Sequence, residues 1–323
     1  MEVFNLTLNQ MLMMFTFILI GYILRKAKVL PEASVTTMSK LETFVFVPSL
    51  TLSNWMENCT VSTLKENYIH ILYGLAIVLF SLFVAYPLSK LFVRNYRESL
   101  ELDYKRNLYK YAFTFGNFGF VGNFIVLGVW GSEGLFKYLM FTLCISLICG
   151  SWGLLVLIPK EKSEAFSLKS ILKRMITPPI VALFIGLMAG LFNAKAYIPN
   201  FFLDVLSKSS SCMGPVAMLL AGFVIGGYEF RNLLSDKKVY LAAILRLTVL
   251  PAIIVLILKM LNTREDIITY ALICFGTPLG LNTIIYPGSF GGETKTGASM
   301  VMISHVLSVI TIPMMYLICI VLM

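Results

Sequence analysis

Two short segments of this sequence place glycine, proline and neutral polar residues in the middle of apolar stretches. One runs from Gly116 to Asn123, and the other runs from Gly276 to Asn282. Glycine costs a helix interior about 1 kcal/mol and proline about 3 kcal/mol, so both segments are expected to interrupt a helix. The second half of an interrupted helix begins with free backbone N–H groups at the positive end of its dipole. These groups favour an anion such as a carboxylate.

The candidate substrate-binding residues are the polar and helix-breaking residues of these two segments. They are Gly116, Asn117, Asn123, Thr277, Pro278 and Asn282. Asparagine and threonine side chains form hydrogen bonds without carrying charge, so they can hold a polar head group and still release it. In the alternative interpretation, the glycines only allow close helix packing, and the asparagines bond to neighbouring backbone.

Three ionisable residues inside apolar stretches have two interpretations each. Arg246 is either functional, as ions within a membrane usually are, or it snorkels to the inner surface. His305 is either a hydrogen-bonded structural residue or a proton carrier, and Glu42 either meets a lysine such as Lys40 or takes part in proton coupling. With only two histidines and no nucleophile paired with a base, we expect no metal site, no cofactor and no enzymatic activity.

The composition excludes a soluble globule. Of the 323 residues, 58% are hydrophobic and 13% are charged, whereas soluble domains are about 25% charged. The mean hydropathy is +0.83. The net charge of +9 comes from basic residues in the short gaps between apolar stretches, where they set membrane orientation and do not indicate a nucleic-acid partner. The sequence therefore predicts an all-α, polytopic protein of the lipid bilayer.

A bilayer crossing needs about 20 apolar residues, and we place ten transmembrane helices. They lie near residues 6–26, 37–55, 68–92, 107–130, 135–159, 172–193, 200–227, 238–259, 267–290 and 298–322. Most of the Lys and Arg residues fall in alternate gaps. Because basic loops stay in the cytoplasm, this pattern predicts a multi-pass protein of the cell membrane with both termini extracytoplasmic.

Five spans in each half give the halves opposite orientations, which predicts an inverted repeat. We assign residues 1–165 to the first repeat and 166–323 to the second, within a single membrane unit. Four pairs of segments correspond in order: 27–31 with 195–199, Pro48 with Pro215, 115–117 with 275–277, and 131–133 with 291–293. The broken helices are then the fourth and the ninth. Breaks in equivalent helices of inverted halves point to a substrate site near the membrane midplane, where the two helices cross.

At these residues the sequence resembles the auxin efflux carrier family, which includes the plant PIN auxin transporters and bacterial permeases for organic acids. Four segments carry the resemblance: Phe44–Leu50, Gly116–Gly131, Thr177–Ile180 and Gly214–Met218. The resemblance implies a fold like that of bile acid sodium symporters, with helices 1, 2, 6 and 7 as a scaffold and helices 3–5 and 8–10 as a mobile transport domain. It also implies a homodimer through the scaffold.

The resemblance assigns roles to individual residues as well. Asn117 stands where the family has an asparagine that contacts the substrate, and Pro278 is the nearest counterpart of a proline in the ninth helix. Gly116 occupies a position where plant members have proline. This departure bears on the geometry of the first crossing helix and on auxin as the substrate.

We therefore expect a secondary transporter or facilitator that moves small organic anions by alternating access. The spans contain almost no Asp or Glu, which favours transport without a coupling ion, because coupled carriers usually need a buried carboxylate. A sodium- or proton-coupled symporter of the same fold is one alternative. A membrane-embedded metabolite sensor without transport is the other.

Overall fold

The structure is a computed structural model, and it describes residues 2–159 and 176–322. In the first of these ranges all the regular elements are helical. Its elements are α1 (Glu2–Lys26), α2 (Ser34–Leu41), η1 (Glu42–Phe46), α3 (Val47–Asn58), α4 (Val61–Phe92), α5 (Leu100–Thr114), η2 (Phe118–Gly122), α6 (Asn123–Ile148), η3 (Cys149–Gly153) and α7 (Leu154–Val156).

The second described range is built in the same way. It contains α10 (Pro178–Leu191), η4 (Ala194–Tyr197), α11 (Asn200–Gly226), α12 (Phe230–Leu233), α13 (Lys237–Ile244), η5 (Leu245–Val249), α14 (Leu250–Met260), α15 (Glu265–Gly276), α16 (Asn282–Ser289), α17 (Lys295–Tyr316) and η6 (Leu317–Leu322). The element η4 is a 3₁₀ turn, and the other η elements are π-helical turns.

The all-α membrane class predicted from the sequence is confirmed. Within residues 2–159 and 176–322 there is no strand, and six helical stretches are long and apolar enough to cross a bilayer; α10 is apolar but shorter. The ten-helix inverted repeat stays a prediction. The expected start of the sixth span at residue 172, like the boundary between the repeats at 165/166, lies outside the described residues.

Local sequence signals account for several helix ends. Thr60 and Thr63 form a reciprocal capping box at the start of α4, and the Ser99 side chain accepts a hydrogen bond from the backbone N–H of Leu102 at the start of α5. Gly131 has φ +67° and turns the chain inside α6; Gly291 has φ +70° between α16 and α17. Only glycine adopts this conformation without strain. The two glycines occupy matching places in the predicted repeats.

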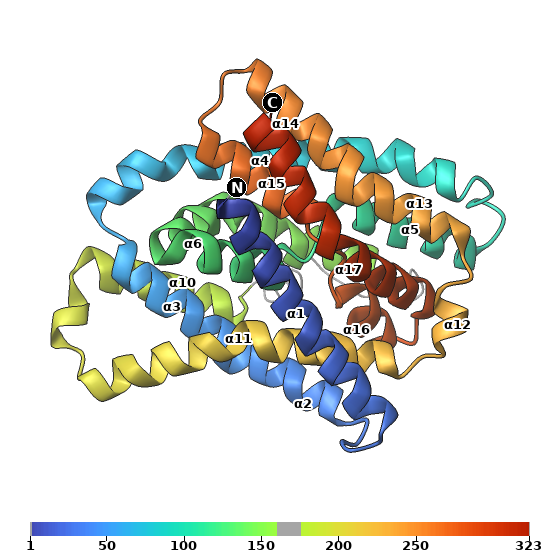
Figure 1. Cartoon of the computed structure of the whole chain (residues 1–323), viewed down its shortest axis with the longest axis horizontal. Helices are drawn as coiled ribbons and strands as arrows, with labels where there is room; N and C mark the ends of the chain where they lie inside the picture. Colours follow the sequence, from blue (N-terminus) through green and yellow to red (C-terminus); the bar gives the residue numbers. More distant parts are fainter. Residues whose placement is uncertain (1, 160–175, 323) are drawn as a thin grey trace.

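The helices pack into two groups of neighbours (Figure 1). In one group, α1 packs along α11, while α3 packs along α10 and α11. In the other, α4 packs on α5 and α6, and α15 and α17 pack together beside α13 and α14. The helix α1 also contacts α17 and α6, so it joins the groups. A buried apolar core that includes Tyr111, Phe115, Tyr138 and Phe275 surrounds the two interrupted helices.

The contact between α1 and α11 depends on a glycine. A Cβ atom at Gly222 would overlap the backbone carbonyl oxygen of Ile18 on α1. We therefore expect Gly222→Ala to push α1 away and to lower the free energy of unfolding by about 1–3 kcal/mol, the usual cost of overpacking. Thermal unfolding of the purified protein in detergent measures this. Gly150→Ala is the matched control, because a Cβ there meets nothing within 4 Å; equal midpoints for the two variants would contradict the expectation.

Candidate functional site

The two predicted helix breaks are present, and they touch. The helix α5 ends at Thr114 and η2 begins at Phe118, while α15 ends at Gly276 and α16 begins at Asn282. The backbone N–H of Asn117 donates a hydrogen bond of 2.6 Å to the carbonyl oxygen of Pro278. Segments 160 residues apart in the chain therefore meet at one point, which we call the crossing (residues 115–118 and 275–281).

Two half-helices begin at the crossing. The carbonyl oxygen of Asn117 accepts the first hydrogen bonds of η2, from the N–H groups of Val121 and Gly122. In α16, the carbonyl oxygen of Leu281 accepts from Ile284. Both helices run away from the crossing, so each directs the positive end of its dipole toward it. The helices α5 and α15 end at the same point with the negative ends of their dipoles, so the crossing presents both free N–H donors and free carbonyl acceptors.

The six predicted site residues differ in how much of their hydrogen-bonding capacity is already used. Thr277 is fully buried, and its hydroxyl donates to the carbonyl oxygen of Cys274 (2.9 Å). The side-chain amide of Asn282 donates to the hydroxyl of Tyr111 (3.0 Å). The side-chain oxygen of Asn123 is buried and has no hydrogen-bond partner in the described part of the chain. Asn123 therefore keeps an acceptor available, whereas Thr277 supports the backbone.

A cavity of about 280 Å³ lies beside the crossing, between η2 and α6 on one side and α3 and α10 on the other. Its lining is mostly apolar, and Asn123 is one of its polar groups. The lining residues are Val47, Thr51, Trp55, Phe118, Gly119, Phe120, Asn123, Leu139, Thr142, Leu143, Ser146, Leu147, Cys149, Gly150, Thr177, Pro179, Ile180 and Leu183.

The cavity is connected to α16 through side chains. The thiol of Cys149, in the cavity wall, lies 3.3 Å from the Tyr111 hydroxyl, which accepts the hydrogen bond from Asn282. Of the predicted residues, Asn123 thus reaches the cavity directly and Asn282 reaches it through Tyr111. Gly116, Asn117, Thr277 and Pro278 lie at the crossing itself and are not among the described residues that line the cavity.

Arg246 also lies at the crossing, although it is not one of the six residues predicted to bind the substrate. It lies in η5 and is only 1% exposed, so the snorkelling interpretation is wrong. Its Nη1 atom donates to the carbonyl oxygen of Phe275 at the C-terminal end of α15. Its Nε and Nη2 atoms are buried and have no hydrogen-bond partner among residues 2–159 and 176–322.

The position of Arg246 explains why residue 116 is glycine. A Cβ atom at Gly116 would lie 2.5 Å from Nη2 of Arg246 and 2.5 Å from the hydroxyl oxygen of Thr277. Any larger residue would force the guanidinium or the second break to move. The signal in the sequence was a single arginine within an apolar span, but it did not say which way the side chain points.

The other two ionisable residues lie elsewhere. His305 is buried; its Nδ1 atom lies 2.8 Å from the Val301 carbonyl oxygen, and its Nε2 atom has no hydrogen-bond partner among the described residues. Glu42 is also buried, but neither of its carboxylate oxygens has a hydrogen-bond partner within the described ranges. The predicted contact between Glu42 and Lys40 is therefore wrong.

Comparison with known proteins agrees with this architecture. The model of a family described as membrane transport protein matches residues 6–316. An uncharacterized transporter of Methanocaldococcus jannaschii is 25% identical over 310 residues, which cover 94% of this chain and 96% of the relative. A second uncharacterized transporter, from Methanothermobacter thermautotrophicus, is 22% identical over 297 residues, which cover 92% and 93% of the two chains. The chain therefore belongs to the membrane transport protein family, and the family predicted from its sequence is confirmed.

Proposed function

We propose that this membrane transporter carries small organic anions, and carboxylates in particular, across the cell membrane by alternating access. The observation that carries the proposal is the buried guanidinium of Arg246 at the crossing. A buried charge without a partner costs several kcal/mol. Arg246 uses one N–H on a carbonyl oxygen and leaves Nε and Nη2 unpaired among the described residues. A carboxylate matches the planar fork of these two donors.

Two half-helix dipoles add to the positive charge of Arg246. Both η2–α6 and α16 begin at the crossing, and the N-terminus of a helix carries about half a positive charge. The C-terminal ends of α5 and α15 direct the negative ends of their dipoles toward the same point, so the full charge of Arg246 is what favours an anionic substrate over a cationic one. Neutral groups such as Asn117 and Asn123 can orient the anion without holding it too tightly for release.

The adjoining cavity suggests the rest of the substrate. Its mostly apolar walls favour a carboxylate with a compact apolar body, because a small polar body would lose its hydration there without compensation. Asn123, with its unpaired oxygen, supplies an acceptor for a hydroxyl or amide N–H group of the substrate. The cavity separates α3 and α10 from η2 and α6, so movement between the two helix groups would change access to it.

The packing supports the predicted scaffold and transport domain. The group of α1, α3, α10 and α11 corresponds to predicted helices 1, 2, 6 and 7. Two features support the inverted repeat: both interrupted helices break at matching positions, and both are followed by a glycine with positive φ, Gly131 and Gly291. The homodimer implied by the family resemblance stays part of this proposal.

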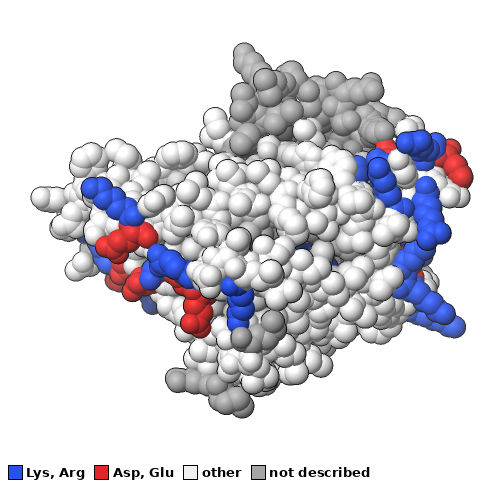
Figure 2. All heavy atoms as spheres, turned by 90° about the horizontal axis from the view of Figure 1, so that it is seen from above, with Lys and Arg blue, Asp and Glu red and all other residues white. Residues whose placement is uncertain are grey.

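Charge at the two ends of the molecule supports the predicted orientation. On the face that Figure 2 shows, basic side chains predominate at the end where Figure 1 places the α4–α5 loop, α12 and α13, whereas acidic and basic side chains are mixed at the opposite end. The positive-inside rule places the basic end in the cytoplasm. Both termini are then extracytoplasmic.

The first test is charge removal at the crossing. We expect Arg246→Gln to lower the initial rate of carboxylate uptake into proteoliposomes by tenfold or more, because hydrogen bonds to a charged group contribute about 1.5–3 kcal/mol. Labelled aliphatic and aromatic monocarboxylates are the substrates to screen. Arg246→Lys keeps the charge and should retain part of the rate, and Arg231→Gln removes an exposed charge outside the site as the control. Unchanged uptake in a folded Arg246→Gln protein would refute the site.

The second test adds one methyl group to the crossing. We expect Gly116→Ala to displace the Arg246 guanidinium or Thr277 and so to reduce uptake severalfold while the protein still folds. Gly288→Ala is the matched control, because its new Cβ would meet only Thr294, at the ordinary contact distance of 3.6 Å. Thermal unfolding of both variants separates loss of transport from loss of the fold. Equal transport by the two variants would show that the close approach at Gly116 does not matter.

The third test concerns the driving force. Because Arg246 supplies a fixed positive charge at the crossing, we expect transport without sodium or a proton gradient. An organic anion crossing 100 mV gains or loses about 2.3 kcal/mol per charge, so an inside-positive potassium diffusion potential should accelerate uptake. The same measurement is repeated with choline in place of sodium and at two pH values.

Glu42 gives the coupled alternative a specific residue. Its buried carboxyl group lacks a partner among the described residues and would be the first candidate if uptake required a proton gradient. Such a requirement, abolished by Glu42→Gln, would replace the uncoupled mechanism with proton symport. A strict requirement for sodium would replace it with sodium symport.

A further inference from the structure

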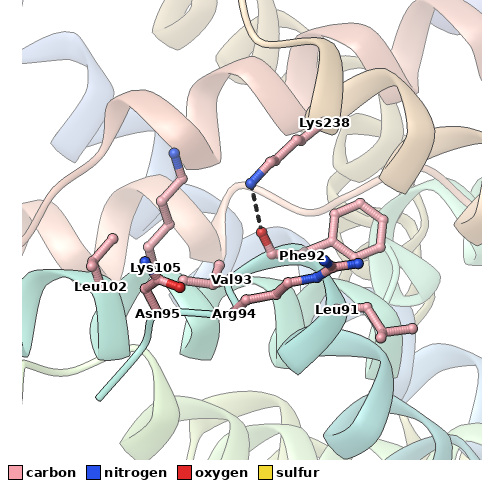
Figure 3. Close-up of a pocket in the computed structure, with 8 residues that line it drawn as sticks. All are labelled: Leu91, Phe92, Val93, Arg94, Asn95, Leu102, Lys105 and Lys238. Carbon is pink, nitrogen blue, oxygen red and sulfur yellow. Dashed lines mark hydrogen bonds between the residues drawn. The ribbon is translucent and has the colours of Figure 1, made fainter. Parts of the chain in front are cut away.

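A second pocket of about 580 Å³ lies at the basic end of the molecule, at the opposite end of α5 from the crossing. It is enclosed by the end of α4, the loop that follows it, the first turns of α5 and the start of α13 (Figure 3). Its lining residues are Leu91, Phe92, Val93, Arg94, Asn95, Leu102, Lys105 and Lys238. None of the transport steps proposed above uses this pocket.

The pocket has an excess of positive charge. Three of its lining residues are basic, and its described lining contains no Asp or Glu. Asp236 is the nearby counter-ion, 3.5 Å from the ammonium group of Lys105. Lys238 donates to the carbonyl oxygen of Phe92 (2.9 Å), as Figure 3 shows, and Arg94 forms no ion pair with a described residue. Of the three cations that line the pocket, Lys105 is paired with Asp236, whereas Arg94 and Lys238 form no ion pair with a described residue.

The same pocket also has an apolar wall. Leu91 is 63% exposed on the last turn of α4, beside the ring of Phe92, and Leu102 lies across from them. An exposed leucine next to three cations matches an amphipathic ligand, whose anionic head meets the cations while its hydrocarbon lies along the leucines. A soluble phosphate would use the cations and leave the apolar wall uncovered.

We propose that this pocket binds the phosphate of an anionic phospholipid. The phosphate oxygens accept hydrogen bonds from Arg94, Lys105 and Lys238, and an acyl chain lies along Leu91 on the outside of α4. Basic pockets between transmembrane helices at the cytoplasmic surface are the usual places where anionic head groups bind. The site is separate from the crossing, so the identity of the transported anion does not affect it.

The bound lipid links two helices that position the transport site. Lys105 belongs to α5, which runs to the break before Asn117, and Lys238 belongs to α13, which continues through η5 to Arg246. A phosphate held by both lysines restrains the two helices relative to each other. The expected consequence is a more stable protein in anionic membranes.

The test measures the thermal unfolding midpoint of the full chain in detergent during titration with dioleoyl phosphatidylglycerol. We expect a saturable rise in the midpoint, because a ligand that binds only the folded state stabilises it. Dioleoyl phosphatidylcholine, which has a phosphate but no net charge, should give little or no rise. Inorganic phosphate is the third arm; if it produced the same saturable rise, the site would be a soluble-phosphate site and the lipid proposal would fail.

Variants assign the effect to the pocket. Arg94→Gln changes an exposed residue and should weaken phosphatidylglycerol binding about fivefold, since each basic residue near an anionic head group contributes about 1 kcal/mol. The double variant Arg94→Gln, Lys105→Gln should weaken it about 25-fold, and Arg94→Lys should restore most of the affinity. The control pair Lys40→Gln, Arg231→Gln removes two exposed charges elsewhere. Equal weakening by the control pair would show nonspecific charge attraction and overturn the proposal.

Discussion

The constraint on which this structure depends is that hydrocarbon offers no hydrogen bonds to backbone groups freed by a broken helix. The backbone N–H and C=O groups freed at each break therefore need hydrogen-bond partners from other parts of the protein. Asn117 donates its N–H to the Pro278 carbonyl oxygen, and Leu279 donates its N–H to the Ser304 hydroxyl. The hydroxyl of Tyr138 donates to the Phe118 carbonyl oxygen. The two breaks support each other, because the free N–H of Asn117 in one is paired with the free carbonyl of Pro278 in the other.

Arg246 follows from the same constraint. The C-terminal end of α15 carries the negative end of a helix dipole and carbonyl groups without helical partners, and the guanidinium of Arg246 binds one of them, the Phe275 carbonyl oxygen. A cation is thereby kept in the membrane interior by backbone that an intact helix would not offer. The glycine at 116 leaves the space that the guanidinium needs. The break after α15, the buried charge of Arg246 and the glycine at 116 therefore depend on one another.

The sequence predicted the breaks well because glycine and proline act locally. Their cost within a helix can be read from two short segments, and their contact could be predicted from the correspondence of 115–117 with 275–277. Side-chain direction could not be predicted in this way. The sequence leaves two opposite directions open for Arg246, and one of the two interpretations of Glu42 gives it a lysine partner that it does not meet. Each outcome depends on which helix packs against that face. Likewise, nothing near Asn282 indicated its bond to Tyr111, 171 residues earlier in the chain.

The π-helical turns explain part of why side-chain direction could not be predicted from the sequence. Arg246 lies in η5, Glu42 lies in η1, and the second half of the first broken helix begins with η2. A π turn contains one residue more than an α turn and shifts the register of everything that follows it, and such turns are frequent at functional sites. A projection with 3.6 residues per turn therefore assigns the wrong face to residues beyond each insertion. In a membrane helix that is apolar on every side, hydrophobic periodicity gives no signal to correct the error, so the polar residues themselves become the only markers of which face points inward.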